Sequence, residues 1–123
     1  HFFLLILILL SAFLVRLYRF DGPIADWHAW RQADTSSVSR NFVNNGFDIL
    51  HPRFDDLSNV ASGKDNPNGY RFVEFPAYNV IQAGLFSLFS FFSLEQWGRI
   101  VTIFSQLLSI VFLYALVKNT REA

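Results

Sequence analysis

The stretch IVTIFSQLLSIVFLYALV, residues 100–117, decides the fold class of this chain. A helix of roughly 20 mainly apolar residues is long enough to cross about 30 Å of hydrocarbon. The polar residues of the stretch follow i, i+3, i+4, i+7 spacing: Thr102, Ser105, Gln106 and Ser109. They form one stripe, which at bilayer depth needs cover from other helices. We therefore predict a transmembrane helix over residues 98–118, in a protein that contains further helices.

A second apolar block opens the chain, from Phe2 to Val15, where nearly every residue is Leu, Ile or Phe. Charged and aromatic residues follow it, as expected at a membrane surface. We predict a transmembrane helix over residues 1–20, truncated at its N-terminus, because the chain has no Met and begins inside the apolar run. The alternative is the apolar core of a signal peptide, which is disfavoured because no small-residue cleavage site precedes Asp21.

Composition and charge narrow the class of protein. Hydrophobic residues make up 52% of the 123 residues and are gathered into blocks. The formal net charge is zero, so no basic field marks a nucleic-acid partner, and we expect none. The absence of Cys excludes disulfides and thiolate metal sites. The expected fold class is all-α, a polytopic membrane protein fragment with two transmembrane helices, an external loop with a short surface helix, and a membrane-interface helix.

Residues 21–75 are expected to form the external loop. They are polar, with eight acidic and five basic residues. Asp34 suits a helix N-cap and Gly46 suits a helix stop, which predicts a short helix over residues 34–45. Residues 51–69 are rich in Pro, Asp, Asn, Ser and Gly, which is typical of turns rather than of a packed element or a calcium-binding loop.

Residues 76–94 form a less uniform apolar segment. On a helix its polar residues fall within one arc: Asn79, Gln82, Ser87 and Ser90. Such a helix either spans the bilayer or lies in the interface with its polar stripe toward water. Lys118 and Arg121 follow the last span and favour a cytoplasmic end there. That orientation would put the loop on the outer side of the membrane and make the helix over residues 76–94 interfacial.

The segment from Asp26 to Thr35 concentrates side chains that could carry chemistry: two Trp, a His, an Arg, a Gln and two Asp. Arg31 could bind a phosphate through two hydrogen bonds. Asp34 could take a proton from an attacking hydroxyl group. His28 and Gln32 are further candidate substrate-binding residues. The structural alternative is that Asp34 only caps a helix and that the Trp residues only anchor the segment in the headgroup layer.

A second candidate segment surrounds Glu74, just before the third apolar block. Glu74 would bring a second carboxylate to the same membrane-surface cleft as Asp34, and Arg71 would bring a cation. The structural alternative is that Glu74 only interacts with the dipole of the helix that follows it. His28 or His51, together with Asp or Glu, could hold a divalent metal, but no tight ligand spacing is present. The metal ligands therefore stay unassigned.

The string Trp-Arg-Gln-Ala-Asp-Thr, the Glu-Phe-Pro motif and Gly98-Arg99 occur in this order along the chain. They resemble the N-terminal part of polyprenyl-phosphate-sugar-dependent membrane glycosyltransferases of the C-type fold. This group includes protein O-mannosyltransferases and the aminoarabinose transferases that modify lipid A. The resemblance covers nearly the whole chain, and it implies that the short helix and the helix over residues 76–94 lie along the outer membrane surface.

The resemblance implies that Asp34 is the catalytic carboxylate. The family often has an Asp-Glu pair at this position, whereas this chain has Ala33-Asp34 and so only one acid. The family's Glu before Pro, which in some members helps to bind a metal or the donor phosphate, corresponds to Glu74. The Lys that usually follows this Glu is absent, so Arg31 or Arg71 would have to contact the phosphate.

The implied activity is transfer of a sugar from a polyprenyl-phosphate donor to a hydroxyl-bearing acceptor, which could be a lipid, a glycan or a protein. The expected location is the outer face of a bacterial or archaeal cell membrane. Asp34 would act as general base, and Arg31, or a metal held partly by Glu74, would stabilise the departing phosphate. Two alternatives remain open: a non-enzymatic membrane assembly or transport component whose loop binds a partner, and a phosphatase or ligase that acts on lipid phosphates.

Overall fold

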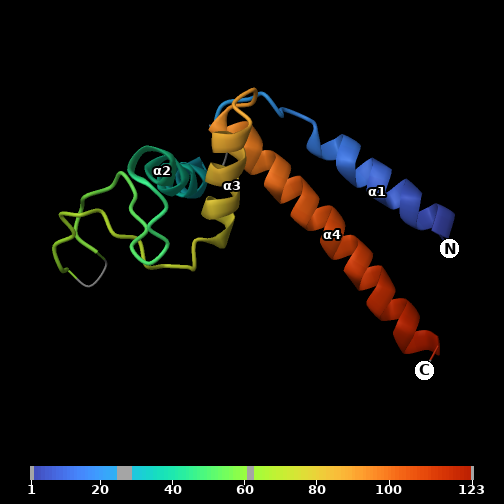
Figure 1. Cartoon of the computed structure of the whole chain (residues 1–123). Helices are drawn as coiled ribbons and strands as arrows, with labels where there is room; N and C mark the ends of the chain where they lie inside the picture. Colours follow the sequence, from blue (N-terminus) through green and yellow to red (C-terminus); the bar gives the residue numbers. More distant parts are fainter. Residues whose placement is uncertain (1, 25–28, 61–62, 123) are drawn as a thin grey trace. The chain divides into compact units, whose positions relative to one another are not determined.

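The computed structural model describes residues 2–24, 29–60 and 63–122, and all regular structure in these ranges is α-helical (Figure 1). The four helices are α1 (Phe2–Arg16), α2 (Ala29–Asn45), α3 (Ala77–Leu88) and α4 (Leu94–Glu122). The all-α prediction is therefore confirmed for the described residues. The chain divides into two compact units: residues 1–22 with 99–123, and residues 23–98.

Only one of the two predicted spans is long enough to cross a membrane. α1 has 15 residues and so extends about 22 Å, less than the hydrocarbon thickness of about 30 Å. Tight turns replace the helix after Arg16, with hydrogen bonds from Leu17 N to Leu14 O and from Phe20 N to Leu17 O, and Arg19 adopts φ 57°. The predicted helix over residues 1–20 was therefore too long.

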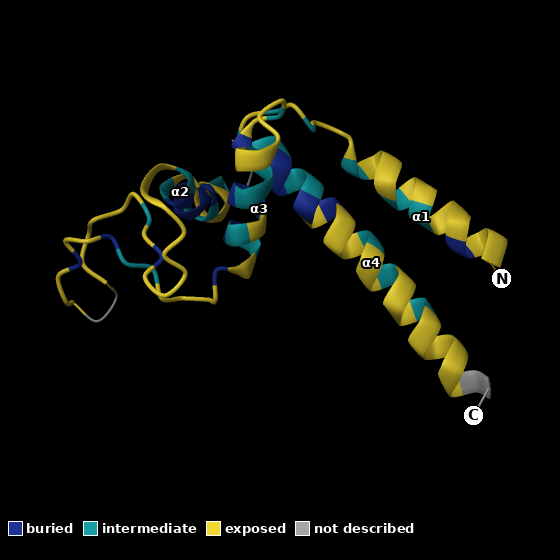
Figure 2. Cartoon of the chain, viewed as in Figure 1, coloured by how far each residue is buried: buried dark blue, intermediate teal, exposed yellow. Residues whose placement is uncertain are grey.

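α4 is the helix that is long and apolar enough to span a membrane, from Leu94 to Thr120. Most of its residues are exposed (Figure 2). It begins earlier than predicted because Ser93 and Gln96 form a reciprocal cap. Gln96 Oε1 accepts from Ser93 N at 2.8 Å, and Ser93 Oγ accepts from Gln96 N at 3.2 Å. This capping box satisfies backbone donors at the first turn.

In the first unit, two arginines form hydrogen bonds between α4 and the residues in and just after α1. The Arg99 guanidinium donates to the carbonyl oxygens of Arg19, Phe20 and Gly22, which belong to the turns after α1. Arg16 Nε donates to Gln106 Oε1 at 2.8 Å. Gln106 is one of the four residues of the polar stripe, so one polar group of this stripe has a partner within the chain although its side chain is exposed.

In the second unit, α2 begins five residues earlier than predicted. Asp34 lies inside the helix and is not its N-cap, because residues 29–33 are themselves compatible with a helix. The predicted end is confirmed: α2 ends at Asn45, and Gly46 follows with φ 92° and donates to Phe42 O at 3.1 Å. The apolar core between α2 and α3 consists of Val38, Phe42 and Ala83, with Val43, Phe54 and Val80 packed against it.

α3 is shorter than predicted, and the side that carries Asn79 and Gln82 faces the protein rather than water. Its 12 residues end at Leu88, and they extend about 18 Å, so this helix does not cross a bilayer. Asn79 and Gln82, the first two residues of the predicted polar stripe, are buried against the protein rather than facing water. Ser87 and Ser90 are exposed.

A buried hydrogen-bond network explains why these two amides face inward. Ser39 Oγ donates to Gln82 Oε1 at 2.7 Å and accepts from Asn79 Nδ2 at 3.1 Å. Asn79 Nδ2 also donates to Thr35 O at 2.7 Å, and Gln82 Nε2 donates to Leu94 O at 2.8 Å. Ser39 and Gln82 are 0% and 2% exposed. The network therefore joins α2, α3 and the first turn of α4 through direct hydrogen bonds.

Gly98 allows the start of α4 to approach α3 closely. A Cβ atom at this position would lie 2.6 Å from Gln82 Nε2 and 2.8 Å from the Tyr78 hydroxyl. That hydroxyl donates to Gly98 O at 2.8 Å. A methyl group here would push on the amide that holds the three helices together.

We predict that Gly98→Ala destabilises the protein, because overpacking costs about 1–3 kcal/mol and the gain in helix propensity offsets about 1 of these. Gly84→Ala is the matched control, since a Cβ at Gly84 meets nothing within 4 Å. This control should leave the stability unchanged or raise it slightly. Thermal unfolding in detergent, followed by helical circular dichroism, measures both; equal midpoints for the two variants would refute the close-approach argument.

Candidate functional site

Two ion pairs join the first half of α2 to residues 71–74. Arg31 Nη2 lies 3.4 Å from Glu74 Oε2, and Arg71 Nη2 lies 3.1 Å from Asp34 Oδ2. Positions three apart share one face of a helix, so Arg31 and Asp34 both face this segment. Each segment carries one cation and one anion, and the antiparallel pairing matches opposite charges. The structure thus brings together four of the six residues predicted for the site.

The two ion pairs differ in their exposure to water. The Arg31 and Glu74 side chains are 58% and 61% exposed, whereas those of Arg71 and Asp34 are 24% and 28% exposed. Water and salt screen exposed charges, so the Arg31–Glu74 pair contributes little to stability. The Arg71–Asp34 pair is the stronger of the two.

The position of Arg71 is set by a short antiparallel contact with residues 52–54. Arg71 N donates to Pro52 O, and Phe54 N donates to Gly69 O, both at 2.8 Å. The Arg71 guanidinium carbon lies 4.8 Å from the centre of the Phe54 ring, within range of a cation–π interaction. Gly69 is required in this contact, because it has φ 62° and a Cβ there would lie 2.6 Å from Phe54 O.

The pKa of the Asp56 carboxyl is lowered mainly by Ser58 and to a smaller extent by Arg71. Hydrogen bonds from Ser58 hold the pKa of the Asp56 carboxyl below its ordinary value, and the charge of Arg71 lowers that pKa further. Ser58 N donates to Asp56 Oδ1 at 2.8 Å.

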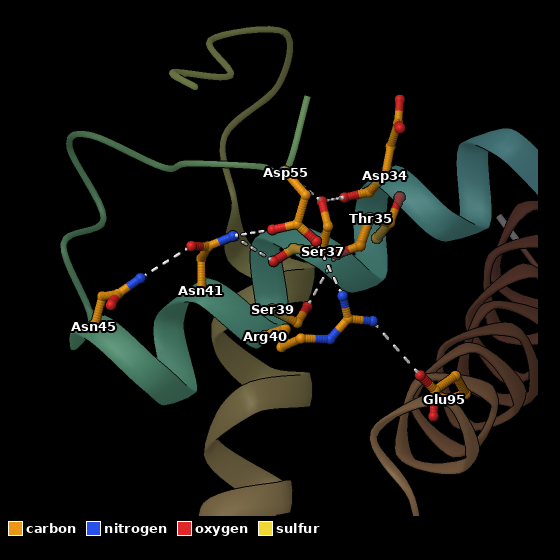
Figure 3. Close-up of polar contacts among 9 residues, drawn as sticks. All are labelled: Asp34, Thr35, Ser37, Ser39, Arg40, Asn41, Asn45, Asp55 and Glu95. Atoms are coloured by element: carbon orange, nitrogen blue, oxygen red, sulfur yellow. Dashed lines mark hydrogen bonds and ion pairs between the residues drawn. The ribbon is translucent and has the colours of Figure 1, made fainter. Parts of the chain in front are cut away.

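A second set of polar contacts holds the loop containing Asp55 on α2 (Figure 3). Both carboxylate oxygens of Asp55 are bonded: Oδ2 to Arg40 Nη1 at 3.0 Å and Oδ1 to Asn41 Nδ2 at 2.9 Å. Ser37 Oγ accepts from Asp55 N at 3.4 Å. The Asp34 carboxylate points away from these contacts in Figure 3. Since Phe54 is adjacent to Asp55, these contacts also position the ring against which Arg71 packs.

The other predicted site residues lie elsewhere or outside the described ranges. Gln32 is exposed and, at 100° per residue, lies about 130° from the face shared by Arg31 and Asp34. His28 falls in residues 25–28, outside the described residues. His51 pairs with Asp48, whose carboxylate lies 3.1 Å from its Nδ1.

The described residues do not assign a metal site. No group of three or more His, Asp or Glu side chains within the described ranges could hold an ion. Glu74 itself is paired with Arg31. We therefore derive no chemical step through a metal.

Sequence reasoning missed Phe54 and Asp55, which position Arg71. Both residues stand in a stretch with the composition of turns, and their partners on α2 and at Arg71 are distant in the chain. No local pattern indicates such a contact. The Arg-to-carboxylate pairing was also missed, because the Arg and the acid of each pair stand some 40 residues apart.

The arrangement offers two carboxylates, each of which lies beside one guanidinium group. Arg71 contacts Asp34 through Oδ2, and no described residue is bonded to Asp34 Oδ1. This oxygen could accept a proton from a hydroxyl group of a ligand. Arg31 is half-exposed and could bind an anion through its planar fork of donors.

Comparison with known proteins adds no further assignment. No family model matches this chain, and no curated protein and no solved structure shows significant similarity to it.

We predict that the two ion pairs make unequal contributions to stability. A double-mutant cycle with Asp34→Asn and Arg71→Gln should give a coupling free energy of about 1 kcal/mol, since this ion pair is partly shielded from water and salt. The cycle with Glu74→Gln and Arg31→Gln should give less than about 1 kcal/mol. Thermal unfolding at low and high salt measures both, and a larger coupling for the exposed pair would contradict the assignment.

Proposed function

We propose that this chain is part of an integral membrane glycosyltransferase that moves a sugar from a polyprenyl phosphate to a hydroxyl group at the outer membrane surface. The observation that carries the proposal is the convergence of Asp34 and Glu74 on one surface, each beside an arginine. Both roles that the reaction needs, a base for the acceptor and a cation for the phosphate, are present there.

The candidate span supports a membrane location for the chemistry. The compact unit of residues 23–98 holds the site, and the candidate span Leu94–Thr120 begins within a few residues of its end in the sequence. A polyprenyl donor keeps its tail in the bilayer and its sugar at the interface. We expect a lipid-borne donor to be accessible to a polar site that is this close in the sequence to a candidate span.

In the proposed reaction Asp34 takes the proton from the acceptor hydroxyl. The acceptor oxygen then forms a bond to the anomeric carbon of the sugar while the bond from that carbon to the phosphate oxygen breaks. The bonding electrons leave with the polyprenyl phosphate, and Arg31 and Arg71 stabilise its charge. General-base catalysis of this kind is typically worth about 10²–10⁴ in rate.

The phosphate of the donor can replace a carboxylate as the partner of either arginine. Arg31 and Arg71 are each held by one carboxylate, and a phosphate group offers either guanidinium a planar, bidentate partner. When phosphate draws Arg71 toward itself, Asp34 Oδ2 loses its partner. Binding of the donor would therefore release the base at the moment it is needed.

We predict that Asp34→Asn lowers sugar transfer by about 10²–10⁴, because an amide cannot take the proton. The measurement is release of labelled sugar from a polyprenyl-phosphate donor by the membrane-inserted protein. Asp65→Asn is the control, since Asp65 is an exposed acid of the same polar stretch. This control should keep normal turnover, and near-normal turnover of the Asp34 variant would remove Asp34 from the mechanism.

The second candidate function is a non-enzymatic membrane component whose polar surface binds a partner. The ion pairs favour this second function, because in this structure both carboxylates already form ion pairs that join α2 to residues 71–74. The exchange of Asp34→Arg with Arg71→Asp separates the two functions. The exchanged protein keeps an ion pair at these two positions but has its carboxylate at position 71. Sugar transfer should therefore remain absent even if the exchange restores the stability of the protein. Full transfer by the exchanged protein would instead show that the pair is purely structural.

A further inference from the structure

The short antiparallel contact that positions Arg71 has two faces, and the candidate site uses only one of them. Arg53 and Tyr70 lie directly opposite each other in this contact, and a backbone hydrogen bond of 2.8 Å flanks the pair on each side. Side chains of such a pair stand close together, and neighbouring residues along each strand point to the other face. Arg71 and Phe54 are those neighbours, so Arg53 and Tyr70 lie on the face opposite to the one that meets Asp34.

Four planar side chains lie together on this opposite face. The ring centre of Tyr70 is 5.8 Å from that of His51 and 5.4 Å from that of Phe72. The Arg53 guanidinium carbon lies 5.3 Å from the centre of the Tyr70 ring. Tyr70 is half-buried in the middle of the group, whereas the other three are exposed, Phe72 at 66%. We call His51, Arg53, Tyr70 and Phe72 the ring platform.

Arg53 differs from the other arginines of the second unit. Arg31, Arg40 and Arg71 each pair with a carboxylate. Within the described ranges, the Arg53 guanidinium has no carboxylate or hydrogen-bond partner, and the Tyr70 hydroxyl has no hydrogen-bond partner. The cation–π contact holds the guanidinium beside the Tyr70 ring. The ring platform therefore offers hydrogen-bond donors that are available to a ligand, next to the exposed ring of Phe72.

His51 adds a hydrogen-bond acceptor to the ring platform. The Asp48 carboxylate lies 3.1 Å from His51 Nδ1 and also accepts from His51 N at 3.1 Å. A carboxylate beside Nδ1 favours the tautomer with its proton there, which leaves Nε2 of the neutral ring as an acceptor. Asp48 thus fixes both the place and the hydrogen-bonding role of the imidazole.

The chemistry of the ring platform matches a sugar. The C–H groups on the face of a pyranose pack against the negative face of an aromatic ring, and its hydroxyl groups both donate and accept. An apolar partner would desolvate Arg53 and His51 without replacing their hydrogen bonds with water. A nucleic acid needs a positively charged surface, whereas residues 23–98 contain eight acidic and five basic residues.

We propose that the ring platform binds a sugar unit of a glycan, which stacks on Phe72 while its hydroxyl groups bond to Arg53 and His51. The inference rests on the proposed transferase function in one respect: the glycan is then the acceptor, rather than a protein or a simple lipid. Because the ring platform and Asp34 use opposite faces of the same contact, the bound unit is not the one that carries the reacting hydroxyl. The ring platform would hold the acceptor by a second sugar.

Saturation-transfer NMR tests the proposal on the membrane-inserted protein in lipid nanodiscs. The probes are mannohexaose and chitohexaose, with a thymidine hexanucleotide as the polyanionic alternative. The test variants are Phe72→Ala and Arg53→Gln, and Phe72→Tyr keeps the stacking ring. Phe75→Ala is the matched control for the ring, since Phe75 is 75% exposed in the same segment, and Lys64→Gln is the control for the cation. Helical circular dichroism confirms that each variant is folded.

We expect at least one of the two saccharides to bind, with saturation transferred from aromatic protons of the protein to the sugar ring. Phe72→Ala and Arg53→Gln should each weaken this binding about two- to tenfold, the range for one aromatic contact. Phe72→Tyr and both controls should bind as the unsubstituted protein does.

Three results would overturn the proposal: no binding of either saccharide, equal binding by the test and control variants, or tighter binding of the oligonucleotide that the test substitutions weaken. The binding assay does not require sugar transfer. A protein that binds a saccharide at the ring platform without transferring sugar would contradict the proposed function alone. Transfer without such binding would contradict this inference alone.

Discussion

The carboxamide of Gln82 is the interaction on which the second unit depends. It accepts a hydrogen bond from Ser39 on α2 and donates one to the Leu94 carbonyl at the start of α4, so a single side chain of α3 binds two other helices. Since Gln82 is 2% exposed, losing either partner would leave a buried polar atom unpaired, at a cost of about 1–3 kcal/mol. The close approach at Gly98 is a consequence, because the amide occupies the space that a side chain there would need.

That network sets the rotation of α2 and therefore the face that carries the candidate site. With Ser39 turned toward α3, Arg31 and Asp34 reach the segment that leads into α3, where Arg71 and Glu74 meet them. The loop contact at Asp55 adds the Phe54 ring beneath Arg71. The proposed chemistry uses the same contacts. A phosphate that competes for the guanidinium groups would weaken the two ion pairs and leave the Asp34 carboxylate without its arginine partner.

The second unit has two exposed surfaces of different character, one charged and one apolar. The ion pairs lie where water and a charged ligand can reach them, while Ile81, Leu88 and Phe91 expose an apolar face. Residues 72–75 alternate between the two, because Glu74 turns to Arg31 whereas its neighbours Val73 and Phe75 stay exposed. A lipid that carries a sugar phosphate has the same two-part character, with an apolar tail and an anionic head.

The sequence by itself determined the helical class, the apolar segment of α4 that is long enough to span a membrane and the stop of α2 at Gly46, since these follow from local composition, helical period and glycine conformation. It did not determine the start of α2, where an attractive N-cap at Asp34 competed with five preceding helix-compatible residues.

Nor did the sequence determine which way α3 faces. Helical period shows that Asn79 and Gln82 share a side, but only the tertiary structure decides whether water or Ser39 covers that side. The pairing of each carboxylate with an arginine some 40 residues away was likewise decided only by the packing of α2 on α3, because a long-range contact leaves no periodic signal in the chain.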